Sequence, residues 1–481
     1  MIKLNLSFLV FWLSFLLYGN LHAQQTAINS ASQSRMYHDI FILASDSLKG
    51  REAGTIGEQM ASDYISKQML QIGLLPKGDH EGSYLSGFRM NYPVIFKEAT
   101  LRVDDIEFKH IEEFGATDLS SSGIVNAPML HIGKGNPTCC KRKKNENGVY
   151  DVGGKIVVMD IASDSVTDDK NALLEDIIAR VTSVVKQGAV GVILHNSSRK
   201  PTEDVLFGSP FTESLAVPVV YIARLPFDKI DKIQTGTCSL SVDIDRTVSK
   251  PSNVIGWIDN KSNKTVVIGA HYDHIGITRS RKGDDKTPQI HNGADDNASG
   301  TAALLELARW AVNDGSLKYN YIFAAFSAEE KGLFGSKAFC SRAWVNNTNI
   351  LYMLNMDMVG RLGCQGDTIS ALGVASSTAW EQILDSIQHP DFSIKKINGA
   401  PAFSDHSPFL KKGIPVIYFT TGLHPQYHTP QDDIELINFP GMVEIEDYLQ
   451  HFIRSAEFLT EIPFQKIGPL QNTKALVQTF R

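Results

Sequence analysis

The stretch from Val266 to Asp296 constrains the fold more than any other part of the chain. An apolar run over residues 266–270 leads into His271-Tyr272-Asp273, a polar loop follows, and Asp295-Asp296 precedes a helical pattern that starts near Ser299. A buried strand, a loop and a helix form one unit of an α/β sheet, and such sheets place their functional groups at the carboxyl ends of strands. Imidazole and carboxylate groups at such an edge suit a metal such as zinc.

The region from Asn253 onward alternates between strand and helix patterns. Strands are predicted at residues 265–270, 319–327, 350–357, 369–374 and 415–422. Helices are predicted at residues 299–312, 333–341, 376–386 and 442–460. This alternation predicts an α/β fold with a mixed central sheet flanked by helices.

The N-terminal part, residues 24–114, shows helical spacing at 38–43 and 57–70, with a break over residues 48–55 and an expected end at Gly73. Arg51 and Glu52 lie in the break, and either a ligand contact or a loop ion pair is compatible with them. Residues 115–250 change character, with strands expected at 155–159, 188–194 and 217–222 and a helix at 173–186. They hold no His and carboxylate cluster at ligand spacing, so this segment is predicted to be a separate, non-catalytic insert.

Composition and charge exclude some classes of protein. The chain has 481 residues, of which 43% are hydrophobic and 21% charged, and its formal net charge is −7, so it is expected to be globular. No long basic run is present, and nucleic acid is therefore not an expected partner. Five cysteines, an odd number, leave at least one outside any pairing within the chain.

Residues 1–23 read as a secretory signal. Lys3 supplies the positive start, residues 7–17 are apolar but too short to span a bilayer, and residues 21–23 resemble a cleavage site. No second long apolar run follows, so no stable membrane span is expected. The protein is predicted to be exported, to the periplasm or the medium, with a catalytic domain over 251–465 and a tail over 466–481.

Further polar groups follow other predicted strands. Glu329 and Glu330 come directly after one, Asp357 ends another inside an apolar run, and His428 follows the last by a short loop. Each has a simpler interpretation: an exposed acidic loop, a hydrogen-bonded Asp, or a structural His. If one of the two glutamates is a ligand, these residues and His271 and Asp295 make a set of two His and three carboxylates. Such a set suits two zinc ions that share a bridging carboxylate.

Several segments resemble the motifs of the M28 family of zinc metallopeptidases. They are AHYDHIG, NGADDNASG, FSAEEKGLFGS, NMDMVG, SDHSPF and YHTPQDD, in this order. The similarity covers about residues 253–460 and extends to LKGREAGTIGEQMASDYI near the N-terminus. The insert resembles a protease-associated (PA) domain, which implies a smaller, β-rich inserted domain.

The resemblance implies a zinc exopeptidase-like fold and a role for each residue. Asp295 would bridge two zinc ions, His271 and Asp357 would complete one site, and Glu330 and His428 would complete the other. Glu329 would be the general base toward a metal-bound hydroxide, and Asp273 would accept a hydrogen bond from the His271 ring. The Asp295–Asp296 peptide bond is expected to be cis. The implied function is the removal of N-terminal residues from peptide substrates by an exported dizinc aminopeptidase.

Other interpretations stay open at this point. Ser404-Asp405-His406 matches a motif near the substrate pocket, although Asp405 and His406 are as compatible with a structural role. Arg361 would hold a substrate carboxylate if the chain were a carboxypeptidase or dipeptidase. A glutaminyl cyclase and a non-catalytic binding module are further alternatives. His274, His291 and His424 are expected to be hydrogen-bonding loop residues, and the sequence does not determine the oligomeric state.

Overall fold

The apolar stretch before His271 forms strand β12 (Thr265–His271), in which every residue is buried. Parallel neighbours flank it on both sides: β15 (Asn320–Phe326) and β16 (Ile350–Met356). Strand β19 (Val416–Thr420) continues the parallel set beyond β16. Strands buried on both faces are expected to read as continuous apolar runs, which is how these four read.

Antiparallel strands extend this sheet at both sides, which makes it mixed. Strand β11 (Ser252–Ile258) pairs with β15 and also with the short β1 (Leu75–Pro76) and β2 (Leu85–Gly87). On the other side β17 (Thr368–Leu372) pairs antiparallel with β19 and parallel with β18 (Ser393–Ile397). In the described part of the chain the sheet has nine strands. Strand β18 is absent from the sequence prediction because none of its residues is buried, so it lacks an apolar run.

This computed structural model describes residues 31–110, 112–134, 151–162, 170–198, 206, 215–233, 236–279, 287–346, 348–363, 366–389, 391–400 and 403–467. The expected signal at 1–23, most of the expected tail, and Cys139, Cys140 and Cys364 lie outside these residues. Cys238 and Cys340 are buried and free. Within the described residues, no helix combines the length and the apolar character needed to cross a membrane.

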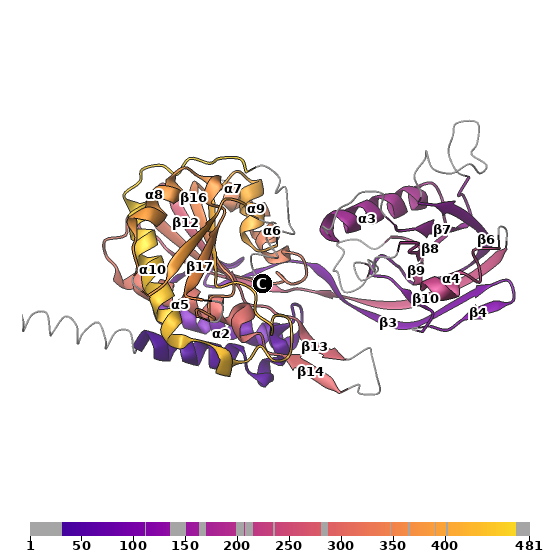
Figure 1. The fold of residues 1–481 in the computed structure, drawn as a ribbon, viewed down its shortest axis with the longest axis horizontal. Helices are drawn as coiled ribbons and strands as arrows, with labels where there is room; N and C mark the ends of the chain where they lie inside the picture. The colour runs from indigo at the N-terminus through magenta and orange to yellow at the C-terminus, as the bar shows by residue number, and fades with distance from the viewer. Residues whose placement is uncertain are drawn as a thin grey trace, which may run out of the picture. The chain divides into compact units, whose positions relative to one another are not determined.

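Helices cover both faces of the mixed sheet (Figure 1). One face packs against the helix over residues 31–43, α2 (Ile56–Ile72), α5 (Gly300–Asn313), α8 (Ala379–Ser386) and α10 (Phe439–Glu457). The other face packs against α6 (Phe334–Ser341), α7 (Ala343–Asn346) and α9 (His406–Lys411). Val266 and Ile268 of β12 face the first core and Val267 faces the second, as strand alternation requires. The predicted α/β fold is therefore confirmed.

Helix α2 ends as its sequence predicts. Gly73 follows it with φ 93°, a left-handed conformation, and its N–H bonds to the Met69 and Leu70 carbonyls. Glycine adopts this conformation without a steric penalty, which explains why the helix stops there.

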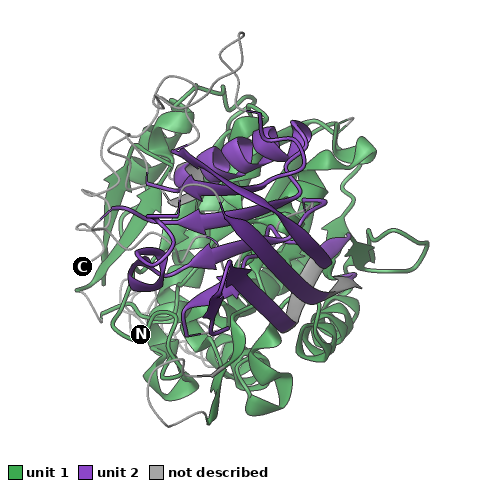
Figure 2. Cartoon of the chain, turned by 90° about the vertical axis from the view of Figure 1, so that its right-hand side faces the viewer, with its two compact units in different colours: residues 1–88, 251–481 green, residues 89–250 purple. Residues whose placement is uncertain are grey.

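The chain divides into two compact units, residues 1–88 with 251–481, and Arg89–Lys250 (Figure 2). The second unit contains one sheet of eight strands in its described part, in the order β4-β3-β10-β6-β7-β8-β9-β5. These strands are β3 (Met90–Val103), β4 (Ile106–Phe108), β5 (Phe114–Ala116), β6 (Gly123–Gly133), β7 (Ile156–Asp160), β8 (Gly191–His195), β9 (Val219–Ile222) and β10 (Thr237–Ser249). Its helices include α3 (Lys170–Lys186) and α4 (Arg224–Phe227).

The second unit begins earlier than the insert start expected at residue 115. Its long strand β3 pairs antiparallel with β10 from Met90–Ser249 to Val103–Cys238. Residues 90–103 therefore belong to the second unit through their pairing with β10, although the sequence pattern changes only after them.

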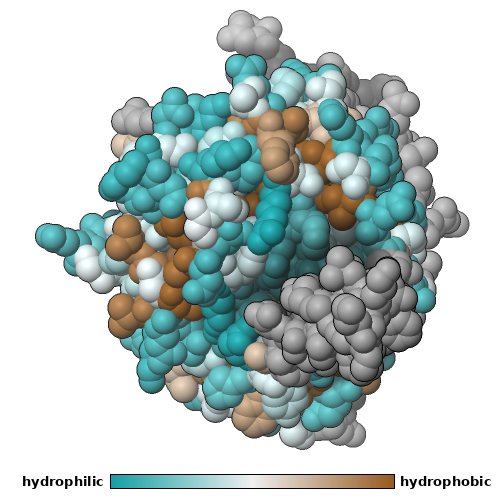
Figure 3. Space-filling view, turned by 90° about the vertical axis from the view of Figure 1, so that its left-hand side faces the viewer, coloured by the Kyte–Doolittle hydropathy of each residue, from teal (hydrophilic) through white to brown (hydrophobic). Residues whose placement is uncertain are grey.

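The outer surface of the chain carries both polar and apolar side chains. Hydrophilic residues predominate on the face in Figure 3, and hydrophobic residues occur there in separate groups. Exposed apolar side chains among the described residues include Leu70, Ile124 and Phe458. Scattered exposed apolar side chains are usual for folded proteins.

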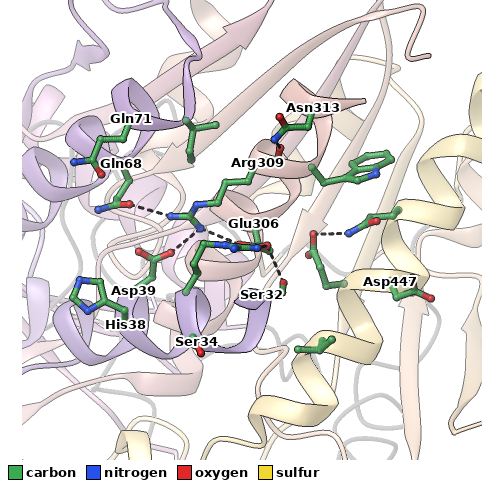
Figure 4. Close-up of a pocket in the computed structure, with 16 residues that line it drawn as sticks. Ser32, Ser34, His38, Asp39, Gln68, Gln71, Glu306, Arg309, Asn313 and Asp447 are labelled. Carbon is green, nitrogen blue, oxygen red and sulfur yellow. Dashed lines mark hydrogen bonds and ion pairs between the residues drawn. The ribbon is translucent and has the colours of Figure 1, made fainter. Parts of the chain in front are cut away.

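A cavity of about 940 Å³ lies between the helix over residues 31–43, α2, α5 and α10. An ion-pair network lines it (Figure 4): Arg309 donates to Asp39 at 3.0 Å and to Glu306 at 3.2 Å. Ser32 and Arg35 also donate to Glu306. This network joins the N-terminal helix to α5 by polar contacts.

Glu446 of α10 lines the same cavity and is 2% exposed. Gln450 donates to its Oε1 at 3.4 Å, and Oε2 has no hydrogen-bond partner within the described residues. Burial raises the pKa of Glu446 well above its usual range. The Glu306 carboxylate raises it further, and Gln450 and Arg309 act in the opposite direction. Folding therefore favours the protonated form of Glu446.

Replacing Glu446 by Gln is expected to make thermal stability less dependent on pH. A carboxyl with a raised pKa in the folded state loses its contribution to stability as the pH rises from its unfolded pKa of about 4.3 toward the folded value. The melting temperature of Glu446→Gln should therefore exceed that of the unsubstituted protein by more at about pH 8 than at about pH 5. The exposed Glu461→Gln variant is the control. A gap that is constant across pH would contradict this prediction.

Candidate metal centre

The candidate site lies where the parallel strands of the mixed sheet end. His271 is the last residue of β12, and Asp357 directly follows β16. Glu329 and Glu330 come shortly after β15, and His428 comes after β19. Because these four strands are parallel neighbours, their carboxyl ends meet at one edge of the sheet.

His271 and two carboxylates form the first group of the site. The Nε2 atom of His271 lies 3.3 Å from Asp296 Oδ1 and 3.3 Å from Asp357 Oδ1. Ser404 Oγ donates to the other Asp357 oxygen at 2.7 Å, which fixes the direction of that carboxylate. One imidazole nitrogen and two carboxylate oxygens thus converge in a buried position.

His428 and Glu330 form the second group. The Nε2 atom of His428 lies 3.1 Å from Asp296 Oδ2 and 3.2 Å from Glu330 Oε2. The other Glu330 oxygen lies 2.9 Å from His274 Nδ1. The His428 side chain is 36% exposed whereas that of His271 is 1% exposed, so the site opens to solvent on the His428 side.

Asp296, and not Asp295, joins the two groups. Its Oδ1 faces His271 and its Oδ2 faces His428. Asp295 turns away from both: its Oδ1 accepts from the Gly360 N–H at 2.7 Å and its Oδ2 lies 3.2 Å from His424. The cis peptide bond is Asp296–Asn297 rather than Asp295–Asp296. The sequence-based assignment was therefore displaced by one residue at this loop.

Glu329 stands apart from the ring nitrogens that contact Glu330. Its N–H donates to Asp273 Oδ1 at 3.0 Å. A carboxylate oxygen of Glu329 lies within 4.8 Å of ligand atoms of both His271 and Asp357. Burial raises the pKa of Glu329 well above its usual range, with His271 acting in the opposite direction and Glu330 raising it further. The two adjacent glutamates therefore occupy different environments.

Asp273 contacts His271 differently from the expectation. The Nδ1 atom of His271 lies 3.2 Å from the main-chain oxygen of Asp273 and 3.8 Å from its carboxylate. The carboxylate instead accepts from the Glu329 N–H, and burial raises its pKa to about 8. The main chain of Asp273 thus orients the imidazole, and its side chain positions the Glu329 segment.

The charges of the site attract cations. Burial alone would lower the pKa of His428, but the Glu330 and Asp296 carboxylates raise it to about 10. Burial would raise the pKa of Glu330, as does Asp296, but His428 and His274 lower it to about 2. Carboxylates crowded in a buried site require a positive partner. Imidazole nitrogens and carboxylate oxygens are the donors that zinc takes, so these residues fit that metal.

Arg361 is buried and engaged with the protein. Its guanidinium donates to the Leu436 carbonyl at 3.0 Å and to Asp432 Oδ1 at 3.4 Å. The other Asp432 oxygen accepts the N–H groups of Asp295 and Asp296, each at 3.0 Å. Arg361 therefore supports the Asp296 loop through Asp432, and the expectation that it reaches a substrate carboxylate has no support in these contacts.

Asp405 and His406 lie beside the first group and are both fully buried. Burial raises the pKa of Asp405 to about 7. The His406 ring stacks on Tyr418 with centroids 5.0 Å apart. A place for Asp405 and His406 near the substrate pocket stays a prediction.

Sequence reasoning missed some residues of the centre. Asp296 was seen only as the neighbour of Asp295, and Ser404 and Asp432 lie in the quoted motifs without an assigned role. His274 was expected to be a hydrogen-bonding loop residue, and its Nδ1 lies 2.9 Å from Glu330 Oε1. His291 and His424 make loop contacts, with Thr278 at 2.7 Å and Asp295 at 3.2 Å respectively. Motif similarity locates such segments, but it does not show which polar group of each points inward.

Known proteins match the part of the chain that carries the candidate site. Residues 253–453 match the family description "Peptidase family M28". Aminopeptidase YwaD of Bacillus subtilis is 28% identical over 270 residues, which is 52% of this chain and 53% of that protein. Leucine aminopeptidase 1 of Ajellomyces dermatitidis is 31% identical over 210 residues, 40% of this chain and 52% of that protein. The chain spans about half the length of the curated relatives it matches.

Solved structures resemble the fold over most of the chain. An aminopeptidase from Aneurinibacillus sp. strain AM-1 has a TM-score of 0.62 and 22% identity, covering 91% of this chain and 96% of that one. The zinc aminopeptidase BSAP from Bacillus subtilis has a TM-score of 0.54 and 22% identity, covering 91% and 98%. At this identity the likeness concerns the fold.

The position of Asp296 generates a prediction about metal content. Asp296→Asn replaces the carboxylate between His271 and His428 by a poorer metal ligand and should lower the zinc retained per chain after dialysis. Asp295→Asn should retain zinc as the unsubstituted protein does, because Asp295 bonds to the Gly360 N–H instead. Mass spectrometry of the bound metal measures both. The reverse ranking of the two variants would restore the assignment to Asp295.

Proposed function

We propose that this chain is a zinc-dependent exopeptidase that removes N-terminal residues from peptides and works with two zinc ions. The observation that carries the proposal is the position of Asp296. Its two carboxylate oxygens face two separate His and carboxylate groups, 3.3 Å from His271 and 3.1 Å from His428. A carboxylate placed in this way is suited to two metal ions that share one ligand.

The proposed ligands divide between the two groups. His271 and Asp357 would hold one zinc ion, His428 and Glu330 would hold the other, and Asp296 would serve both. Bound zinc lowers the pKa of a coordinated water and polarises the carbonyl of the scissile bond. Ser404 and His274 orient the ligands, because they contact Asp357 and Glu330 respectively.

Glu329 is the proposed general base. The nearby Glu330 is engaged by His274 and His428, whereas Glu329 lies beside His271 and Asp357 with its N–H held by Asp273. In this role Glu329 accepts a proton from the attacking water and delivers it to the leaving amine. Asp273 holds the segment that carries Glu329 in a constant position relative to His271.

Two observations favour the amino end of the substrate. The relatives matched by sequence carry aminopeptidase names. The buried Arg361, which a carboxypeptidase would use for a terminal carboxylate, is bound to Leu436 and Asp432. The carboxypeptidase, glutaminyl cyclase and binding-module alternatives have no observation in their favour.

Export and the nature of the second unit are further parts of the proposal. Residues 1–23 have the pattern of a secretory signal, which supports export to the periplasm or the medium. The unit over Arg89–Lys250 is proposed to be a PA-like domain, because it is a separate β-rich insert and no metal-binding group is found among its described residues. Peptides are the proposed substrates.

A matched pair of peptides tests the proposed function. The zinc-loaded protein should shorten a peptide with a free amino terminus by its first residue and leave the N-acetylated peptide intact, as mass spectrometry would show. A chelator should abolish the cleavage and added zinc should restore it. Loss of residues from the carboxyl end of both peptides would overturn the aminopeptidase assignment.

The role of Glu329 gives a separate prediction. Glu329→Gln should keep the bound zinc and lower kcat by about 10²- to 10⁴-fold, because the amide cannot accept the proton. Glu330→Gln should lower zinc retention as well as turnover, which distinguishes the two neighbours. If Glu329→Gln kept near-normal kcat, another group would have to be the base.

A further inference from the structure

Arg51 is a fully buried arginine that bonds to main-chain carbonyl groups from several segments. Its Nε donates to the Tyr272 carbonyl at 2.7 Å, and its Nη2 donates to the Gly293 carbonyl at 2.9 Å. Its Nη1 donates to the Asn292 carbonyl at 2.6 Å and to the Leu43 carbonyl. Within the described residues, the hydrogen bonds of its guanidinium all go to carbonyl oxygens.

The carbonyls that Arg51 binds belong to the two loops that carry the proposed metal ligands. Tyr272 stands directly between His271 and Asp273, and Asn292-Gly293 lies a few residues before Asp296. In addition, the His274 N–H donates to the Arg51 main-chain oxygen at 3.4 Å. One planar guanidinium therefore bonds to both loops, which also pair with each other at Gly276 and His291. A planar group with five donors suits this task.

The Asp296 loop is held from its other side by Asp432. The Asp432 carboxylate accepts hydrogen bonds from the N–H groups of Asp295 and Asp296. Arg51 donates hydrogen bonds to the carbonyls of Asn292 and Gly293. The loop is thus bound through its donors at one end and through its acceptors at the other. This arrangement restricts where the Asp296 carboxylate can lie.

The backbone around Arg51 is packed against the same loops. Lys49, Gly50 and Arg51 have φ values of 51°, 69° and 51°. A Cβ on Gly50 would lie 2.5 Å from the His291 carbonyl oxygen and 2.6 Å from that of Gly276. Such left-handed conformations in non-glycine residues persist where the surroundings enforce them, and they concentrate near functional sites.

The charge of Arg51 and its geometry have opposite effects on a bound metal. Burial lowers the pKa of Arg51 to about 10, while the carboxylates of Asp273, Asp296, Asp432 and Glu330 act in the other direction, so the group is charged at neutral pH. A fixed positive charge near the site disfavours zinc, and it stabilises the carboxylates. A substitution that keeps the charge and removes the geometry therefore isolates the positioning effect.

We propose that Arg51 is a positioning residue of the metal centre, which sets the distance between the His271 loop and the Asp296 loop through its carbonyl contacts. This inference rests on the proposed function, since it concerns the same metal ligands. It assigns to the segment before α2, far from the ligands in sequence, a direct influence on zinc affinity.

Arg51→Lys is the test, with zinc affinity measured by competition with a chromogenic chelator. The lysine keeps the charge, but its three donors sit on one nitrogen and cannot reproduce the four carbonyl contacts that the guanidinium makes through three nitrogens. Zinc affinity is expected to fall by about 10- to 100-fold, as is usual when a group that orients metal ligands is lost. Hydrogen exchange followed by mass spectrometry should increase in peptides that cover residues 271–276 and 291–297 and stay unchanged in α10.

Arg180→Lys is the matched control. Arg180 of α3 also donates to main-chain carbonyls, those of Lys134, Asp160 and Ile161, but it belongs to the other compact unit. Its substitution should leave zinc affinity unchanged even if it lowers the melting temperature. An equal loss of zinc affinity in both variants would overturn the proposal.

The outcomes separate this inference from the proposed function. If the unsubstituted protein does not bind zinc, the proposed function fails and the inference fails with it. If it binds zinc and Arg51→Lys binds zinc equally well, the inference alone is overturned. Arg51→Gln is the second variant in case the lysine variant does not fold. Unfolding of both, with Arg180→Lys folded, would show that Arg51 holds the fold rather than the loop spacing.

Discussion

The parallel pairing of β15, β12, β16 and β19 is the constraint on which the rest of the centre depends. Residues at the carboxyl ends of neighbouring parallel strands must lie near one another, and here they include His271 and Asp357, with Glu329, Glu330 and His428 in the loops that follow. The buried apolar strands supply a rigid base because both of their faces are covered by helices. Polar groups far apart in the sequence are thereby brought into contact, as His271 is with Asp357, 86 residues away, and His428 with Asp296.

Crowding these carboxylates is costly, and the surrounding residues offset the cost in different ways. His271, His274 and His428 face the acidic groups directly. Arg51 and Asp432 act on the backbone instead, holding the carbonyls and the N–H groups of the loop that carries Asp296. A site supported in this manner is organised by the protein before a ligand binds, which is a general requirement for metal centres and catalysis.

Much of the fold followed from sequence patterns alone. The parallel core strands and helices α5, α6 and α10 were predicted within a few residues, because their apolar spacing is strong. Strand β18 and helix α9 were not predicted, since β18 is largely not buried and α9 is short. The start of the second unit was placed too late because β3 joins it through pairing with the distant β10, and pairing partners cannot be read from one strand.

The sequence by itself determined the class of fold and the set of segments that form the centre. Each candidate ligand follows an apolar run, and that run predicts the strand whose end carries the ligand. Only the tertiary structure decided which of two adjacent carboxylates faces inward. Asp295 and Asp296 are the same residue type in consecutive positions, and they differ only in their distant partners. The Gly360 N–H donates to the Asp295 carboxylate, whereas His271 and His428 lie against the Asp296 carboxylate. The same holds for Arg51 and Arg361, whose partners are carbonyls and carboxylates brought close only by folding.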